Sequence, residues 1–199
     1  MKQLLLDIKP VAAPTLQNFV AGRNAEALSN LKSTIEIKNH FIYFWGETGS
    51  GKSHLLSACE AGGIRIADDV HLLDDKAQVA LFNTYNQLKE NGEILVAAGA
   101  HAPNQMDLRN DLATRLAWDL VYQLHPLNDA EKAQALKNHA KERGIKLPDE
   151  VIDYCLRYMR RDLPTLMATL DALDDWSLTM HKPVTVPMLK QLLQLDLGI

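Results

Sequence analysis

Apolar residues follow two patterns along this chain. Short, largely apolar runs bounded by turn residues are typical of strands in a parallel sheet, and they lie at 41–45, 64–67, 93–98 and 119–124. Apolar residues at helical spacing lie before and between these runs, at 25–32, 54–59, 75–90 and 106–118. Because strands alternate with helices, the pattern predicts an α/β domain built on a parallel sheet.

Beyond residue 127 the pattern is helical only. The predicted helices cover 130–143, 149–160, 163–179 and about 187–195. Asn24 is the predicted N-cap of the helix over 25–32, Asn128 or Asp129 that of the helix over 130–143, and Asp162 that of the helix over 163–179. We therefore expect three parts, namely a peptide and linker at 1–14, an α/β core at 15–127 and a helical lid at 128–199.

Residues 46–53 carry the strongest chemical signal. They read G-x-x-x-x-G-K-S and lie directly between a predicted strand and a predicted helix. In such a loop glycines let backbone N–H groups wrap phosphate oxygens, Lys52 reaches the β- and γ-phosphates, and the Ser53 hydroxyl ligates Mg²⁺. A chance glycine-rich turn is the alternative, and the strand and helix on either side disfavour it.

A second acidic motif follows at Asp68 and Asp69, which end the predicted strand over 64–67. In P-loop enzymes the first such carboxylate holds the Mg²⁺ water shell and the second polarises the attacking water. An N-cap for the segment after Asp69 is the alternative. Only residues 54–67 separate Ser53 from Asp68, which leaves room for one helix and one strand. We therefore expect no further strand or helix between the two motifs.

Composition narrows the class of protein. The 199 residues are 47% hydrophobic and 23% charged, with a net charge of −4, so no chain-wide basic field attracts nucleic acid. No apolar run approaches the roughly 18 residues of a membrane span, and the start lacks a signal-peptide pattern. Cys59 and Cys155 lie in helical patterns and are expected to be buried thiols, which indicates a cytoplasmic protein.

A short, mostly apolar segment at residues 3–8 precedes a linker at 9–14 that contains two prolines. It resembles the Q-L-x-L-x-[LF] peptide with which bacterial proteins bind the DNA sliding clamp. The matching positions are Gln3, Leu4, Leu6 and Ile8. An edge strand or a docked tail is the alternative.

Several longer stretches resemble the AAA+ module of the DnaA-related family, and most closely the shorter regulators that inactivate the initiator. The stretches are 19–24, 68–69, 111–118, 123–127, 144–148 and 166–173. The resemblance covers nearly the whole chain. Initiators carry a C-terminal helix-turn-helix domain, whereas this sequence ends soon after the predicted lid, so we expect no direct sequence-specific DNA binding.

The resemblance implies roles for individual residues. Arg115 matches the arginine finger that reaches a neighbouring subunit's nucleotide, although a salt-bridging helix arginine is the alternative on sequence alone. Asp69 would be the second catalytic residue, and Ser53 and Asp68 would hold Mg²⁺. The residues expected to bind ADP or ATP are Gly46, Glu47, Thr48, Gly49, Ser50, Gly51, Lys52, Ser53 and His54, with Val20 and Gly22 near the adenine.

Three features depart from the family pattern. The usual family sheet has a further strand before the strand over 64–67, and the short spacing leaves no room for it. The resemblance therefore implies a shortened sheet that lacks this second strand and has 64–67 at its edge, where the charge of Arg65 protects against edge pairing. Ala100 stands where relatives have a polar sensor, and Pro164 stands where many have a sensor arginine. Without these two groups we expect weak ATPase activity. The resemblance implies a negative regulator of replication initiation that holds ADP in preference. It would stimulate ATP hydrolysis by DnaA together with the sliding clamp, and we expect a homodimer. The alternatives are an autonomous AAA+ ATPase or loader-type factor, and a P-loop scaffold without activity.

Overall fold

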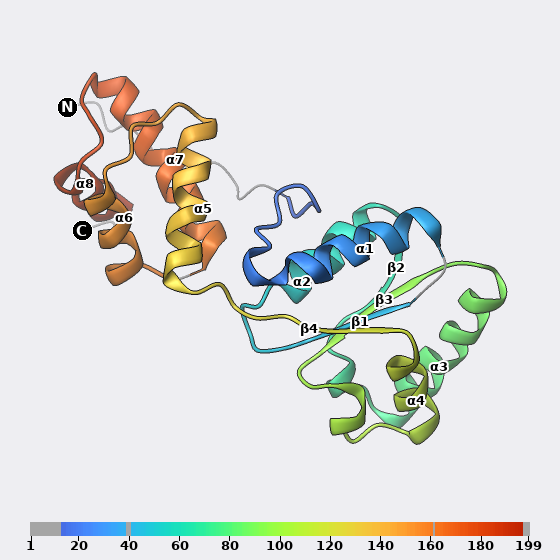
Figure 1. Ribbon diagram of the computed structural model, residues 1–199. Helices are drawn as coiled ribbons and strands as arrows, with labels where there is room; N and C mark the ends of the chain where they lie inside the picture. The colour runs from blue at the N-terminus through green and yellow to red at the C-terminus, as the bar shows by residue number, and fades with distance from the viewer. Residues whose placement is uncertain (1–12, 39–40, 161, 197–199) are drawn as a thin grey trace. The chain divides into compact units, whose positions relative to one another are not determined.

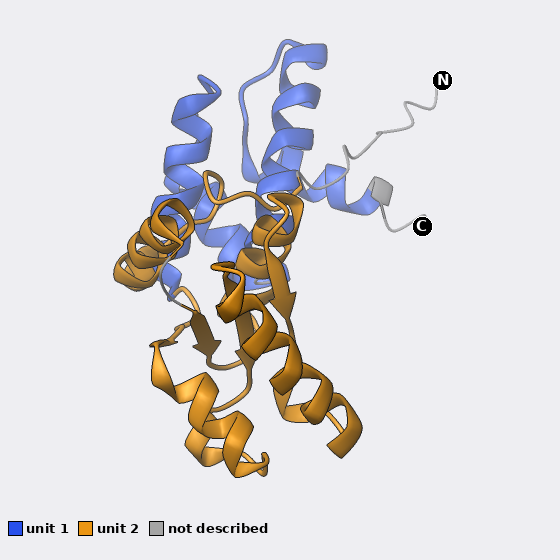
Figure 2. Ribbon diagram, turned by 90° about the vertical axis from the view of Figure 1, so that its right-hand side faces the viewer, with its two compact units in different colours: residues 1–12, 128–199 blue, residues 13–127 orange. Residues whose placement is uncertain are grey.

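The computed structural model describes residues 13–38, 41–160 and 162–196 (Figure 1). The chain divides into two compact units, and the boundary lies between Leu127 and Asn128 (Figure 2). The clamp-peptide positions Gln3, Leu4, Leu6 and Ile8 lie outside the described residues. The sheet unit comprises residues 13–127, and the helical unit begins at Asn128.

The sheet unit, orange in Figure 2, contains a four-stranded parallel sheet. Its strands are β1 (Ile42–Trp45), β2 (Arg65–Ala67), β3 (Leu95–Gly99) and β4 (Leu120–Gln123). The order is β2-β3-β1-β4, so the P-loop strand β1 is central and β2 lies at an edge. The shortened parallel sheet and the edge position of β2 confirm the expectation drawn from the family resemblance and the short spacing between Ser53 and Asp68.

Helices cover both faces of this sheet (Figure 1). One face carries α1 (Ala25–Ile37) and α2 (Lys52–Ala61), and the other carries α3 (Asp75–Glu90) and α4 (Asn110–Trp118). Ile42 and Phe44 are buried toward the first pair of helices. Tyr43, between them, is buried toward the second pair, as the two-residue period of a strand requires. The α/β core is therefore a three-layer arrangement.

Three local predictions were wrong. The helix predicted from 106 begins at Asn110, because Arg109 is extended and gives its N–H to the Gln78 side chain. The helix predicted over 25–32 runs on to Ile37 and ends at Lys38 in the left-handed region. Asn24 does not cap that helix with its side chain, because its amide pairs with the backbone of His125.

The helical unit, blue in Figure 2, contains only helices and their connections in its described part. Its elements are α5 (Asp129–Glu142), α6 (Asp149–Tyr158), α7 (Leu163–Met180) and α8 (Val186–Asp196). Asn128 caps α5 in a capping box with Glu131, and Asp162 caps α7 by accepting the Thr165 N–H. Leucine, isoleucine and valine side chains from all four helices form one buried core. In the described residues, no helix has both the length and the apolar character needed to cross a bilayer.

Candidate functional site

The loop between β1 and α2 has the backbone of a phosphate cradle. Gly46, Gly49 and Gly51 all have positive φ, at 149°, 81° and 98°. At Gly46 an added Cβ would collide with the backbone carbonyl of Leu124, which has no freedom to move aside. At Gly51 an added Cβ would lie 2.6 Å from the Phe19 ring. Glycine is thus required by conformation and by space at Gly46 and Gly51, and by conformation alone at Gly49.

Polar groups of the same loop point inward. The Lys52 ammonium donates to the carbonyls of Gly46 and Glu47, at 2.6 and 3.0 Å. Burial lowers the pKa of Lys52, and the carboxylates of Asp68 and Asp69 oppose that shift. Ser50 is 4% exposed, and its Oγ has no hydrogen-bond partner among the residues that the structure describes. A buried hydroxyl without a partner fits a site built for a polar ligand.

The structure brings the two predicted magnesium residues together. The Ser53 hydroxyl donates to Asp68 Oδ2 at 3.0 Å, across the gap between α2 and the end of β2. Asp68 Oδ1 accepts the N–H of Asp69 at 2.8 Å. Asp69 is exposed and has φ 48°, a strained conformation for a residue with a side chain. Hydroxyl and carboxylate oxygens are the donors that Mg²⁺ prefers, so these residues fit a bound Mg²⁺, whose charge would neutralise phosphate oxygens.

A segment before α1 packs on the start of α2. The Phe19 ring lies 5.4 Å from the His54 ring in an edge contact. His54 Nε2 lies 3.0 Å from the carbonyl oxygen of Thr15. Val20 and Gly22, the predicted adenine neighbours, follow directly along this segment. The contact between Phe19 and His54 was not anticipated from the sequence, since neither residue belongs to the phosphate-binding pattern.

Arg115 lies on the last turn of α4, away from the P-loop. Its guanidinium is 5.9 Å from the centroid of the Tyr85 ring, a cation–π distance. The Tyr85 ring in turn contacts Phe41, the residue before β1, with centroids 4.2 Å apart. The P-loop follows the other end of β1, so Arg115 and Lys52 lie at opposite ends of the strands. Trp118, one turn beyond Arg115, is 68% exposed.

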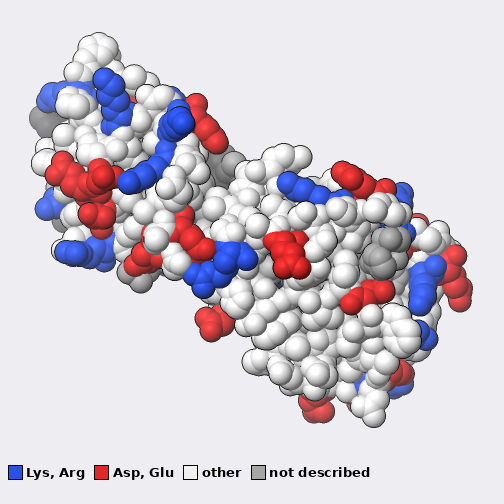
Figure 3. Space-filling view, viewed as in Figure 1, with Lys and Arg blue, Asp and Glu red and all other residues white. Residues whose placement is uncertain are grey.

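Four further residues singled out in the sequence lie in the P-loop, after β3 and in α7. Glu47 and Thr48 are exposed in the P-loop, and Ala100 follows the carboxyl end of β3. Pro164 lies in the first turn of α7, where it has no N–H to offer a phosphate. On the face of each unit drawn in Figure 3, acidic side chains occur among the basic ones, so no continuous basic field is visible there.

Comparisons with known proteins agree with this fold. Residues 129–193 match the family model described as Hda, lid domain. Domain III of the Thermotoga maritima replication initiation protein DnaA superposes with a TM-score of 0.68 at 21% identity, over 94% of this chain and 98% of that one. A DNA replication initiation factor gives a TM-score of 0.64 at 21% identity over 81% of this chain.

A third structure is the replication initiator DnaA bound to AMPPCP and single-stranded DNA, with a TM-score of 0.66 at 21% identity. This chain covers 66% of that structure and 64% of the replication initiation factor, so it spans about two thirds of their lengths. Residues 129–193 thus carry the Hda lid domain on a chain with the fold of DnaA domain III. The chain therefore has an AAA+ fold, and its helical unit is similar to the lid of Hda.

Proposed function

We propose that this protein is a negative regulator of replication initiation that binds an adenine nucleotide and presents Arg115 to ATP held by the initiator DnaA. The sliding clamp is the second partner in this proposal. The match of residues 129–193 to the Hda lid domain supports the regulatory class. The role of each residue rests on the geometry described above.

The position of Arg115 carries the proposal. Lys52 follows the carboxyl end of β1, whereas Arg115 reaches Tyr85 and Phe41 beside its amino end. The four residues of β1 span roughly 13 Å at about 3.3 Å per residue. Arg115 is therefore too far from its own P-loop to contact a phosphate there. A charge in this position serves a nucleotide on another subunit.

The surroundings of Arg115 support a protein-facing role. Trp118 exposes 68% of its surface one turn away. Tryptophan and arginine are the residue types most enriched at binding hot spots. The guanidinium is also held over the Tyr85 ring, which limits the conformational freedom lost when a partner binds.

The P-loop supports nucleotide binding by the protein itself. The three glycines with positive φ, the inward Lys52 and the pair Ser53–Asp68 fit the phosphates and Mg²⁺. A similar fold is bound to AMPPCP in a DnaA structure. Ala100 and Pro164 offer no charged group to a γ-phosphate. We therefore expect tighter binding of ADP than of ATP and slow turnover by the protein alone.

The test is a reconstitution with two readouts. ATP turnover is measured for this protein alone, and then for DnaA with the clamp loaded on DNA and this protein added. We expect little turnover in the first case and stimulated turnover in the second. Rapid turnover by the protein alone, with no effect on DnaA, would instead establish the autonomous ATPase that the intact Lys52, Ser53, Asp68 and Asp69 would allow.

The clamp interaction is tested separately with the double variant Gln3→Ala and Leu6→Ala. We expect this variant to lose clamp binding while it keeps the nucleotide affinity of the wild type. If it binds the clamp as tightly as the wild type, the N-terminal peptide is not the clamp-binding element.

A further inference from the structure

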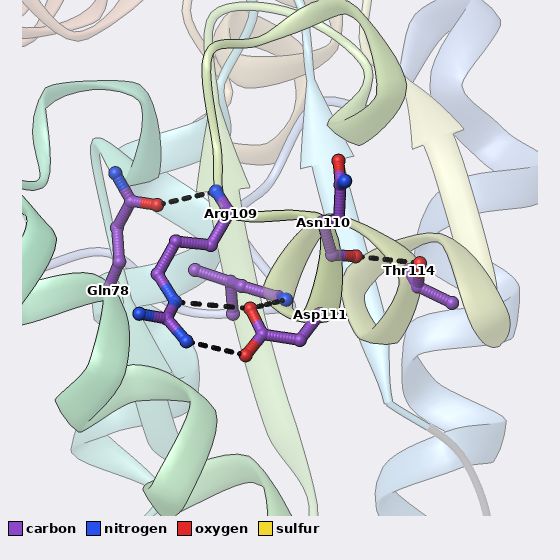
Figure 4. Close-up of polar contacts among 6 residues, drawn as sticks. Gln78, Arg109, Asn110, Asp111 and Thr114 are labelled. Carbon is purple, nitrogen blue, oxygen red and sulfur yellow. Dashed lines mark hydrogen bonds and ion pairs between the residues drawn. The ribbon is translucent and has the colours of Figure 1, made fainter.

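Gln78 is a buried polar residue that the nucleotide site does not explain. It lies in the first turn of α3 and is 4% exposed. Its amide nitrogen donates to the carbonyl of Leu73 at 3.0 Å. Its amide oxygen accepts the N–H of Arg109 at 2.8 Å (Figure 4). One side chain thus satisfies two backbone groups from two different segments.

The two segments joined by Gln78 both have functional neighbours. Leu73 directly follows η2 (Val70–Leu72), a single turn of 3-10 helix that begins immediately after Asp68 and Asp69. Arg109 is the residue before α4, the helix that carries Arg115. Gln78 therefore connects the turn that follows the magnesium carboxylates to the helix that presents the arginine finger.

The start of α4 is defined further by its own residues. The Arg109 guanidinium forms a two-pronged ion pair with Asp111, at 3.2 and 2.9 Å (Figure 4). Asp111 Oδ1 also accepts the N–H of Leu112 at 2.8 Å. At the other end of α4, Arg115 lies against Tyr85 of α3. α4 is thus attached to α3 at both ends, by Gln78 and by Tyr85.

We propose that Gln78 is a positioning residue for Arg115, which fixes α4 against α3 and ties it to the turn after Asp68–Asp69. This inference rests on the proposed function, since it concerns the delivery of Arg115 to a partner's ATP. A displacement of about 1 Å in a catalytic group can cost about 10²-fold in rate, so a loss of this tether is measurable. The residue acts through the backbone of Arg109 and does not touch the nucleotide.

The perturbation is Gln78→Met, which keeps the length of the side chain and removes both polar atoms. The matched control is Gln87→Met, at an exposed glutamine of the same helix. DnaA turnover is measured against increasing amounts of this protein, with the clamp on DNA. Mispositioning of Arg115 lowers the plateau of stimulation by roughly tenfold or more and leaves the half-saturating concentration within about threefold. ADP affinity and clamp binding are measured on the same samples and are expected to stay within about threefold.

A second variant, Gln78→Glu, adds a pH readout. The ionised carboxylate accepts the Arg109 N–H but has no proton for the Leu73 carbonyl. Burial raises the pKa of an introduced carboxyl, and protonation supplies the missing donor. Stimulation by Gln78→Glu, relative to the wild type at each pH, should therefore rise as the pH is lowered, whereas that by Gln78→Met should not.

The outcomes separate this inference from the proposed function. A wild-type plateau in Gln78→Met, with Arg115→Ala inactive, refutes the positioning role and leaves the function intact. The positioning role is also refuted if Gln87→Met lowers the plateau as much as Gln78→Met does. If the wild type itself fails to stimulate DnaA, both the function and the inference are wrong.

Discussion

Asn24 joins two segments that lie far apart in sequence. Its replacement tests how the sheet unit, residues 13–127, is held together. Asn24 is 3% exposed. Its side-chain amide donates to the carbonyl of His125 at 2.8 Å, and its amide oxygen accepts the His125 N–H at 2.8 Å. This pair of hydrogen bonds fixes the segment before α1 to the segment after β4. The neighbouring residue Leu124 places its backbone carbonyl close to Gly46 of the P-loop.

The expected cost follows from the groups left without partners. Asn24→Leu leaves one N–H and one carbonyl of His125 unsatisfied, at about 1–3 kcal/mol each. The free energy of unfolding should therefore fall by about 2–6 kcal/mol. A helix cap alone would be worth about 1 kcal/mol, and aspartate caps a helix as well as asparagine does. Asn24→Asp therefore distinguishes the two roles, because a carboxylate has no N–H for the His125 carbonyl.

The assay is urea unfolding of the full chain, followed by far-ultraviolet circular dichroism. Wild type, Asn24→Leu and Asn24→Asp are compared at neutral pH, with Asn83→Asp at an exposed position of α3 as the control. We expect Asn24→Asp to be destabilised by at least about 1 kcal/mol and Asn83→Asp to stay within about 0.5 kcal/mol. If Asn24→Asp is as stable as the wild type, the bridge to His125 contributes little.

Three further predictions concern the nucleotide site and α4. Lys52→Ala should lower ADP affinity at least tenfold in calorimetry, because the ammonium is the cation aimed into the loop; unchanged affinity would place the nucleotide elsewhere. Phe19→Ala should weaken ADP binding by roughly 2- to 12-fold, because the edge contact of its ring with His54 is worth about 0.5–1.5 kcal/mol. Phe19→Leu should weaken ADP binding by less. Leu28→Ala, at a partly buried position of α1, is the control. The hydrogen bond from Arg109 lowers the pKa of the Asp111 carboxyl. The ion pair is therefore present at neutral pH and is lost only as the pH falls below the ordinary aspartate pKa of about 3.9. Arg109→Ala should return the Asp111 midpoint toward that value in an NMR titration, and an unmoved midpoint would show that the ion pair is not its cause.

The sheet and the phosphate loop were predictable because their signals are local. The run 41–45, the glycines at 46, 49 and 51 and Lys52 are neighbours in the chain, and each restricts the conformation of the next. The position of β2 at the sheet edge followed from the short spacing between Ser53 and Asp68 together with the strand order usual in the family that the sequence resembles. Both signals depend on fewer than about 25 residues of sequence, the scale on which periodicity and spacing are informative.

The contacts that position the site residues were not predictable in this way. Asn24 pairs with His125, and Gln78 pairs with Arg109, through ordinary amide groups that carry no signature in the sequence. Asn24 precedes a helix and was therefore assigned the local role of a cap. The backbone N–H of Arg109 is taken by Gln78, which is why α4 starts later than its apolar spacing indicates. Long-range pairing overrides a local preference in each case.

The proposed trans action of Arg115 is tested most directly in a single turnover. DnaA is loaded with labelled ATP and freed of excess nucleotide, so that only the ATP on the initiator is counted. This protein, with the clamp on DNA, is then added as the wild type or as Arg115→Ala, with Arg157→Ala in α6 as the control. Arginine fingers accelerate such reactions by about 10³–10⁵-fold, so Arg115→Ala should reduce the rate to that of DnaA alone while Arg157→Ala matches the wild type. An Arg115→Ala protein that still stimulates hydrolysis as the wild type does would contradict the account.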